Sequence, residues 1–244
     1  MNWIIGDIHG CLEQFDSVLA KIKERDSEAQ IYCVGDYCDR GPNTRGVVDR
    51  ILAEGNIKCV RGNHDDVFDC IISCKPTQLS DNQGSDAPME NLAWFLNFGM
   101  YETLASYGIY HDDVREALRT MTNMRAMAAR IPESHAKFFN ELPLMIEEKD
   151  FFVAHAAVVP ESDLKSILEY DTHRKAMIWG RYDLQQIKSN KEWGKTGYFG
   201  HTPTHFYGEK GIVSGPNIEL IDTGCVFGNC LTAVCHETKE IITS

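Results

Sequence analysis

The stretch WIIGDIHG, residues 3–10, joins a short apolar segment to two polar side chains that are flanked by glycines. The apolar residues Trp3 to Ile5 predict a buried strand that ends at Gly6. Glycine allows the backbone to turn sharply off a strand and to approach a site closely. We therefore expect Asp7 and His9 at the carboxyl end of a strand, directed into a site.

The same pattern occurs twice more in the first third of the chain. Apolar strands are predicted at residues 31–34 and 57–60, and each is followed by a glycine-led polar motif, GDYCDRG (35–41) or GNHD (62–65). Helical periodicity covers residues 12–24 and resumes from Val47 to Leu52. Such βαβ units place the carboxyl ends of parallel strands at one edge of a sheet. We expect four side chains to meet there: Asp7, His9, Asp36 and Asn63.

The second half of the chain adds two histidines, each directly after an apolar strand. His155 lies in FFVAHAA and His201 lies in YFGHT. Strands are predicted at 151–154, 197–199, 218–221 and 231–235. The last two are expected to form an antiparallel pair joined by the turn-rich stretch DTGCVFGN.

The middle of the chain has a different pattern. Residues 75–88 are polar and contain two prolines and a glycine, which predicts a loop, whereas 91–142 are mostly helical in periodicity. The length of 244 residues favours one domain. We expect a single α/β domain over 1–244, with central mixed β-sheets flanked by helices and a helical cap insertion at about 75–145.

Carboxylate, amide and imidazole ligands suit manganese, iron or zinc, and the lack of thiolates in the set argues against a structural zinc site. A lone Asp at a strand end is usually a turn former, and a lone buried His is usually a hydrogen-bonded core residue. Five motifs in this order, each at a strand end, make that reading of the whole set untenable. A carboxylate shared between two ions would hold them at two-metal separation, and Asp36 is the expected bridge.

The composition limits the kinds of binding partner and the cellular compartment that we expect for this protein. The net charge of -12 argues against a protein that binds nucleic acid by counterion release. The nine cysteines include no CxxC pair, so we expect free thiols and a reducing, cytoplasmic environment. No apolar run is long enough to cross a membrane. The first motif starts at Gly6, and we expect no signal peptide before it.

Together the motifs GDIHG, GDYCDRG and GNHD, with His155 and His201, resemble the PPP family of metallophosphatases, the serine/threonine protein phosphatases. The resemblance is strongest to the bacterial and phage branch typified by the lambda phage phosphatase. It extends to ELPLMIE (141–147), MIWGR (177–181), FGHTP (199–203) and IDTGCVFGNCLTA (221–233). The resemblance implies a calcineurin-like metallophosphoesterase fold and hydrolysis of phosphomonoesters on proteins or small molecules.

By position, the resemblance implies two divalent ions, with manganese as the first choice and iron or zinc as alternatives. The first ion would take Asp7, His9 and Asp36. The second would take Asp36, Asn63, His155 and His201. A hydroxide bridging the ions is the expected nucleophile, because two cations lower the pKa of bound water.

The resemblance also implies roles for four further residues. His64 matches the general acid that protonates the leaving oxygen, and Asp39 matches the carboxylate that orients it. Arg40 and Arg181 match the phosphate clamps, since a guanidinium can bind two oxygens at once. For Arg61, which precedes Gly62, we favour a structural role.

Two features depart from the family pattern. The motif GNHD ends in Asp65 where glutamate is more usual, so a contact behind the ligands is expected to be lost or rerouted. The insertion between Asp65 and His155 is longer than in the small phage enzyme. We hypothesise that it forms a helical cap that shapes substrate choice.

Three alternatives remain. A symmetrical bis(5'-nucleosyl)-tetraphosphatase (a diadenosine tetraphosphate hydrolase) shares these motifs, but GDYCDRG and FGHTP favour the protein phosphatase. A calcineurin-like nuclease would commonly carry a second histidine where this chain has Pro203. A non-catalytic binding module is disfavoured, because every expected ligand and both members of the acid dyad are present.

Overall fold

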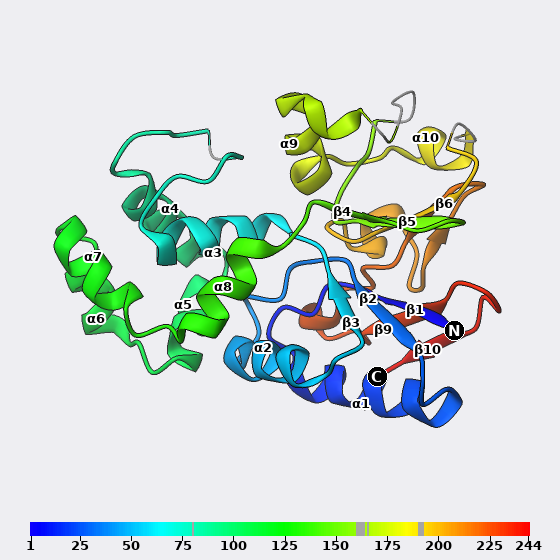
Figure 1. Ribbon diagram of the computed structural model, residues 1–244, viewed down its shortest axis with the longest axis horizontal. Helices are drawn as coiled ribbons and strands as arrows, with labels where there is room; N and C mark the ends of the chain where they lie inside the picture. Colours follow the sequence, from blue (N-terminus) through cyan, green and yellow to red (C-terminus); the bar gives the residue numbers. More distant parts are fainter. Residues whose placement is uncertain (80, 160–163, 165, 190–192) are drawn as a thin grey trace.

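Two five-stranded sheets form the centre of the computed structural model, which describes residues 1–79, 81–159, 164, 166–189 and 193–244 (Figure 1). The first sheet has the order β10-β9-β1-β2-β3 and contains β1 (Asn2–Ile5), β2 (Gln30–Cys33), β3 (Ile57–Cys59), β9 (Thr232–Cys235) and β10 (Ile241–Thr243). The second has the order β4-β5-β6-β8-β7 and contains β4 (Met145–Glu147), β5 (Phe151–Ala154), β6 (Thr196–Phe199), β8 (Ile218–Leu220) and β7 (Val213–Ser214). This architecture confirms the expected α/β class with mixed sheets.

The sheets pack against each other because their strands alternate between two apolar environments. In β1, Ile4 joins the cluster between the sheets, whereas Trp3 and Ile5 face the helices on the other side. In β5, Val153 joins the same central cluster, whereas Phe152 faces outward to a separate cluster. A strand that is buried on both faces has apolar residues at successive positions, which explains the sequences WII (3–5) and FFVA (151–154).

Parallel pairing sets the direction of the strand ends. β1 pairs parallel with β2, and β2 with β3, while β6 pairs parallel with both β5 and β8. The polar motifs therefore leave both sheets at their carboxyl ends, where α/β sites form.

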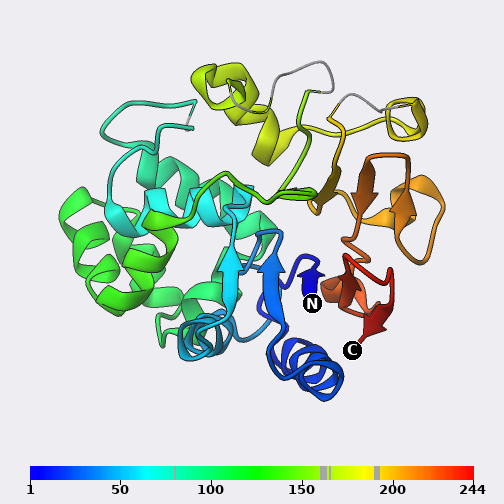
Figure 2. The same ribbon diagram turned by 45° about the vertical axis from the view of Figure 1, so that its right-hand side comes forward.

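Two amphipathic helices cover the outer face of the first sheet (Figure 2). Helix α1 (Leu12–Arg25) buries Phe15, Val18 and Ile22, and α2 (Thr44–Ala53) buries Val47, Val48 and Ile51. Asn43 caps α2 by accepting a hydrogen bond from Gly46 N at 2.9 Å. The helical periodicity of these segments is confirmed.

The helical insertion lies beside the first sheet, at the side opposite the second sheet's β7 edge (Figures 1 and 2). It follows the polar turn at Gly62 and consists of α3 (Asn63–Ser73), α4 (Ala87–Phe95), η1 (Leu96–Phe98), α5 (Met100–Ser106), α6 (His111–Ala117), α7 (Met121–Ala128) and α8 (Glu133–Glu141). Its apolar residues, among them Phe95, Leu104 and Phe139, belong to the same cluster as Trp3 and Ile31. The insertion and the first sheet thus share one core.

The outer face of the second sheet is covered by α9 (Asp171–Trp179) and α10 (Leu184–Ser189). Short 3-10 helices lie at η2 (Ile167–Glu169), η3 (Thr204–Tyr207) and η4 (Cys225–Phe227). The sequence patterns did not predict α9, α10 or the edge strands β4, β7 and β10. These elements are short or lie at the sheet edges, where periodicity gives little signal.

The expected antiparallel pairing of residues 218–221 with 231–235 is wrong. β8 pairs with β6 and β7 in the second sheet, whereas β9 pairs with β1 and β10 in the first. The stretch between them, which contains Gly224 (φ 78°) and Gly228 (φ 90°), crosses from one sheet to the other. A hairpin and a crossing connection have the same turn-rich composition, so local sequence could not distinguish them.

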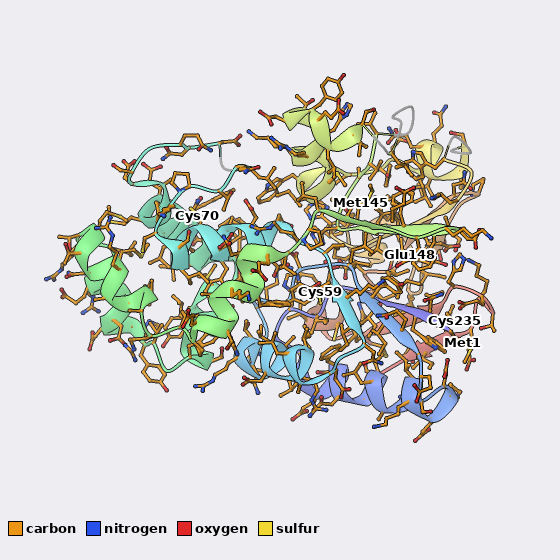
Figure 3. All side chains as sticks on the ribbon, in the orientation of Figure 1. Met1, Cys59, Cys70, Met145, Glu148 and Cys235 are labelled. Atoms are coloured by element: carbon orange, nitrogen blue, oxygen red, sulfur yellow. The ribbon has the colours of Figure 1, made fainter. Side chains whose placement is uncertain are left out.

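All nine cysteines are free thiols, as expected. Figure 3 shows three of them, Cys59, Cys70 and Cys235, on the separate elements β3, α3 and β9. Among the described helices, none combines the length and the apolar character needed to cross a membrane.

Candidate functional site

The carboxyl ends of both sheets bring the six expected metal ligands to one buried place. Asp36, which follows β2, is central: its Oδ2 lies 3.4 Å from His9 Nε2 and 3.4 Å from His155 Nε2. A single carboxylate oxygen therefore lies between a ligand that follows the first sheet's β1 and one that follows the second sheet's β5. This is the position that a bridging ligand requires.

Asn63 joins the second group of ligands. It is the first residue of α3, and its Oδ1 lies 3.1 Å from His155 Nε2 and 2.9 Å from His201 Nδ1. Asp7 connects the two sheets, because its Oδ2 accepts a hydrogen bond from His201 N at 3.0 Å. Asp7 and Asp36 also form a cluster with His155 in which one ligand atom from each residue lies within 4.8 Å of the others.

The donor set fits metal ions. Asp7 Oδ1 and His201 Nε2 are buried and have no hydrogen-bond partner among the described residues. Buried polar atoms are normally paired, so an orphaned acceptor in a cluster of carboxylates and imidazoles points to a cation. Burial raises the pKa of Asp7 well above its usual value, and repulsion from Asp222 and Asp36 adds to the shift. Two divalent ions would offset this repulsion.

Two imidazoles are held in the tautomer that metal binding needs. His9 Nδ1 donates to the Cys38 carbonyl at 2.7 Å, and His155 Nδ1 donates to the Val34 carbonyl at 2.8 Å. Each Nε2 is then left with a lone pair that faces Asp36. Burial lowers the pKa of His155 to about 4 and that of His9 well below its usual value, so both rings stay neutral.

Two glycines leave room for the carboxylates. A Cβ on Gly62 would lie 2.1 Å from Asp36 Oδ1, and a Cβ on Gly200 would lie 1.9 Å from Asp7 Oδ1. Any side chain at these positions would displace a ligand. The glycine that precedes Asn63 and the one that precedes His201 are thus required by close approach rather than by flexibility.

Asp65 supports the bridging ligand from behind. Its Oδ2 accepts from Asp36 N at 2.7 Å and from Gly62 N at 2.9 Å, and its Oδ1 accepts from Tyr37 N at 2.9 Å. The side chain is fully buried. The shorter carboxylate at this position therefore contacts both the loop after β2 and the turn at Gly62.

His64 and Asp39 form the expected pair. His64 Nδ1 lies 2.6 Å from Asp39 Oδ2, and both side chains are buried. Burial lowers the pKa of His64 to about 4 and raises that of Asp39 to about 8. Both pKa shifts favour the neutral forms of the two side chains. A protonated His64 beside an ionised Asp39 therefore depends on the short hydrogen bond between them and on the groups that hold the carboxylate.

The two expected phosphate clamps lie at the mouth of the site. Arg40 donates from Nη2 to His64 Nε2 at 2.9 Å and from Nη1 to His9 Nε2. Arg181 is exposed and donates to Thr202 Oγ1 at 2.8 Å. Both line one pocket together with Asp36 and His64. Their charges face the same space.

Motif matching missed several residues of this site. The pocket, of about 130 Å³, is also lined by four aromatic side chains, Trp94, Phe95, Phe98 and Trp179. Trp94 and Trp179 are 52% and 41% exposed, and their rings are nearly parallel at 22° with centroids 6.5 Å apart. Trp94 was visible in the sequence only as an apolar residue of a helical segment, which normally indicates core, and Trp179 only as a member of MIWGR, to which no pocket role was given.

Two polar residues were also missed. Thr103, from α5, contacts Asp39. Asp222, which follows β8, is buried beside Asp7 and accepts from Gly224 N at 2.9 Å. Asp222 lies at a strand end in IDTG, so the strand-end signal that identified the other ligands could have identified it.

Arg61 has the structural role expected of it. Its guanidinium is buried and donates to Asp66 at 2.9 Å and to Asp69 at 3.0 Å. It also donates to the carbonyls of Phe139 and Asn140, at the end of the insertion. Arg61 therefore ties the two ends of the insertion together.

This fold and this site define a metal-dependent phosphoesterase. The chain belongs to the calcineurin-like phosphoesterase family, which it matches over residues 3–211. It is 27% identical to serine/threonine-protein phosphatase 1 of Salmonella typhimurium, over 94% of this chain and 89% of that protein. It is also 27% identical to the asymmetrical bis(5'-nucleosyl)-tetraphosphatase PrpE of Oceanobacillus iheyensis (98% and 90% covered), and 24% identical to a symmetrical one of Cellvibrio japonicus (99% and 97% covered).

Solved structures agree on the fold. A metallophosphoesterase from Sphaerobacter thermophilus matches 99% of this chain with a TM-score of 0.54 at 18% identity, covering 86% of that chain. A protein serine/threonine phosphatase from Saccharomyces cerevisiae matches 100% of this chain with a TM-score of 0.51 at 12% identity, covering 78% of that chain. Relatives of similar identity thus include both phosphoprotein and dinucleotide hydrolases.

Proposed function

We propose that this chain is a two-metal phosphomonoester hydrolase of the serine/threonine protein phosphatase type, close to the bacterial and phage branch. The observation that carries the proposal is the 2.6 Å contact between His64 and Asp39 directly beside the Asp36 cluster. An imidazole held by a carboxylate, next to a cation site, is the arrangement that protonates a leaving oxygen while phosphate is held.

In this proposal Asp7, His9 and Asp36 hold one ion, and Asp36, Asn63, His155 and His201 hold the other. When bound, two divalent ions, manganese first among them, activate water and neutralise phosphoryl oxygens. Burial keeps the imidazole ligands neutral, the carbonyls of Cys38 and Val34 fix the tautomers of His9 and His155, and Asp65 keeps the Asp36 loop in place.

The remaining residues act on the substrate. Arg181 and Arg40 bind the phosphoryl oxygens, and His64 Nε2 gives its proton to the leaving oxygen as the phosphorus–oxygen bond breaks. In the structure Arg40 donates to that same Nε2. Arg40 must therefore turn from His64 to the phosphate before the imidazole can carry the transferable proton. Phosphate binding and activation of the acid are linked through this one side chain.

A second candidate function is symmetrical dinucleoside tetraphosphate hydrolysis. The specific observation in its favour is the exposed pair Trp94 and Trp179 at the pocket mouth, because flat aromatic rings stack on nucleobases. We rank it second because Trp179 and Arg181 stand in MIWGR, the segment that resembles the protein phosphatases.

An activity panel tests the proposal. The purified protein is assayed with Mn²⁺, Fe²⁺ or Zn²⁺ against a phosphoserine peptide, a phosphothreonine peptide and diadenosine tetraphosphate, with phosphate and nucleotide release measured separately. We expect phosphopeptide turnover with at least one metal and little cleavage of the dinucleotide. Efficient cleavage of diadenosine tetraphosphate alone would establish the second candidate instead.

The variant His64→Asn serves as the internal control. We expect it to retain both ions by elemental analysis and to lose about 10²–10⁴-fold in turnover of the phosphopeptides, which is the usual worth of a general acid. Wild-type turnover by a fully metallated variant would remove His64 from the mechanism.

A further inference from the structure

The backbone of Asp39 has an unusual conformation. Its φ is 69°, in the left-handed region that residues with a side chain rarely adopt. Arg40, the next residue, has a φ of 68°. Such residues persist only where their surroundings hold them. The contacts that hold this segment therefore bear directly on the acid pair.

Thr103 holds Asp39 at two points. Its Oγ1 accepts a hydrogen bond from Asp39 N at 2.6 Å and donates one to Asp39 Oδ1 at 2.8 Å. The other carboxylate oxygen, Oδ2, faces His64 Nδ1. Thr103 thus fixes both the strained backbone of Asp39 and the rotation of its carboxylate, while both side chains are fully buried.

The hydroxyl group of Thr103 can satisfy its hydrogen bonds in only one orientation. A threonine hydroxyl has one proton and two lone pairs. The proton of Thr103 goes to the Asp39 carboxylate, so the 3.1 Å contact with Thr44 Oγ1 requires Thr44 to be the donor. All three bonding positions of the Thr103 hydroxyl are then occupied, and no other rotation satisfies the same groups.

The same part of the insertion holds the neighbouring residue. Arg40 N donates to the carbonyl of Gly99, the residue before α5, at 3.1 Å. A Cβ on Gly99 would lie 2.2 Å from Arg40 N, so only glycine permits this approach. The start of α5 is therefore pressed against the Asp39–Arg40 segment, one turn from Thr103.

We propose that Thr103 is a positioning residue for the reaction: it aims the Asp39 carboxylate, and through it the His64 imidazole, at the leaving oxygen. The inference rests on the proposed role of His64 as the general acid. On this proposal the insertion, through Thr103 of α5, helps to orient the general acid as well as lining the pocket. Thr103 itself does not touch the substrate.

The test compares Thr103→Val, which replaces the hydroxyl by a methyl of similar size, with Thr103→Ser, which keeps the hydroxyl. Turnover is measured on p-nitrophenyl phosphate, whose leaving group needs little protonation, and on a phosphoserine peptide, whose alkoxide needs a proton. We expect Thr103→Val to lose about 10- to 100-fold on the peptide, a fraction of a full general-acid effect, and less than about 3-fold on the aryl ester. Thr103→Ser should restore the wild-type ratio.

Two controls accompany these variants. Thr122→Val makes the same change at an exposed position of α7 and should behave as wild type. His64→Asn should show the same selective loss on the peptide, but larger. Metal content and thermal unfolding are measured for every variant. A loss of activity caused by missing ions can then be distinguished from one caused by misoriented Asp39 and His64 side chains.

An equal loss by Thr103→Val on both substrates, or no loss, would overturn the proposal. If Thr103→Val does not fold, Thr103→Ala takes its place, and failure of both to fold would show an architectural role and overturn it as well. If His64→Asn itself shows no dependence on the leaving group, it is the proposed function that fails, whatever Thr103 does.

Discussion

At the residue scale, the site gathers backbone conformations that side chains normally avoid. His9, Asp36 and His201 have φ values of 44°, 56° and 65°. The φ values of Asp39 and Arg40 are also positive. Each such residue costs on the order of 1–3 kcal/mol and persists because its neighbours hold it. In the case of Asp36, the neighbour is Asp65, which accepts the hydrogen bond from the Asp36 amide.

This contact leads to a prediction for Asp65→Asn. The variant keeps the shape of the side chain but loses acceptor capacity toward the amides of Asp36, Tyr37 and Gly62. We expect Mn²⁺ affinity to fall about 10- to 100-fold, as is usual when a group behind a ligand is removed. Titration calorimetry of the metal-free protein would measure it. Asp112→Asn on the insertion surface is the control, and equal affinity in the two variants would rule out the role of Asp65.

At the scale of elements, the insertion is fastened to the first sheet by a buried ionic network and by apolar packing. Arg61 pairs with Asp66 and Asp69 of α3 and donates to the carbonyls at the end of α8. These contacts bring the two ends of a long helical segment together. Separate hydrogen bonds place α5 beside Asp39: Arg40 N donates to the Gly99 carbonyl, and Thr44 contacts Thr103.

The variant Arg61→Met tests this fastening. It leaves two buried carboxylates unpaired, and breaking one partner of a buried pair costs about 3–5 kcal/mol. The free energy of unfolding, from urea denaturation, should fall by about that amount. Arg119→Met removes an exposed arginine that pairs with Glu116, and it should change stability by less than about 0.5 kcal/mol. Similar losses for the two variants would contradict the network's importance.

At the scale of the whole molecule, the two sheets are joined by the ligands as well as by their shared core. Asp7, Asp36 and Asn63 follow strands of the first sheet, and His155 and His201 follow strands of the second. Ions held by both groups would resist separation of the sheets. Burial raises the pKa of Asp7 and of Asp36, and repulsion from Asp36 adds to the shift of Asp7, so these charged carboxylates lower stability unless cations accompany them.

We therefore expect metal removal to lower global stability. A ligand present at about 1,000 times its Kd stabilises by about 4 kcal/mol, which corresponds to roughly 10 °C in Tm for a chain of this size. Thermal unfolding after chelation and after re-addition of Mn²⁺ would measure the difference. Asp36→Asn should lose most of the metal-dependent increase, and a wild-type increase in that variant would exclude Asp36 as the shared ligand.

The sequence by itself determined the parts of this protein that are local. Polar residues directly after apolar strands indicated Asp7, His9, Asp36, Asn63, His155 and His201 as candidate ligands, because parallel strands present their carboxyl ends at one edge. Only the tertiary structure decided that β8 and β9 lie in different sheets, that Thr103 reaches Asp39, and that Trp94 and Trp179 flank the pocket. These relations join residues far apart in the chain, and their local patterns are those of any turn or any helical core residue.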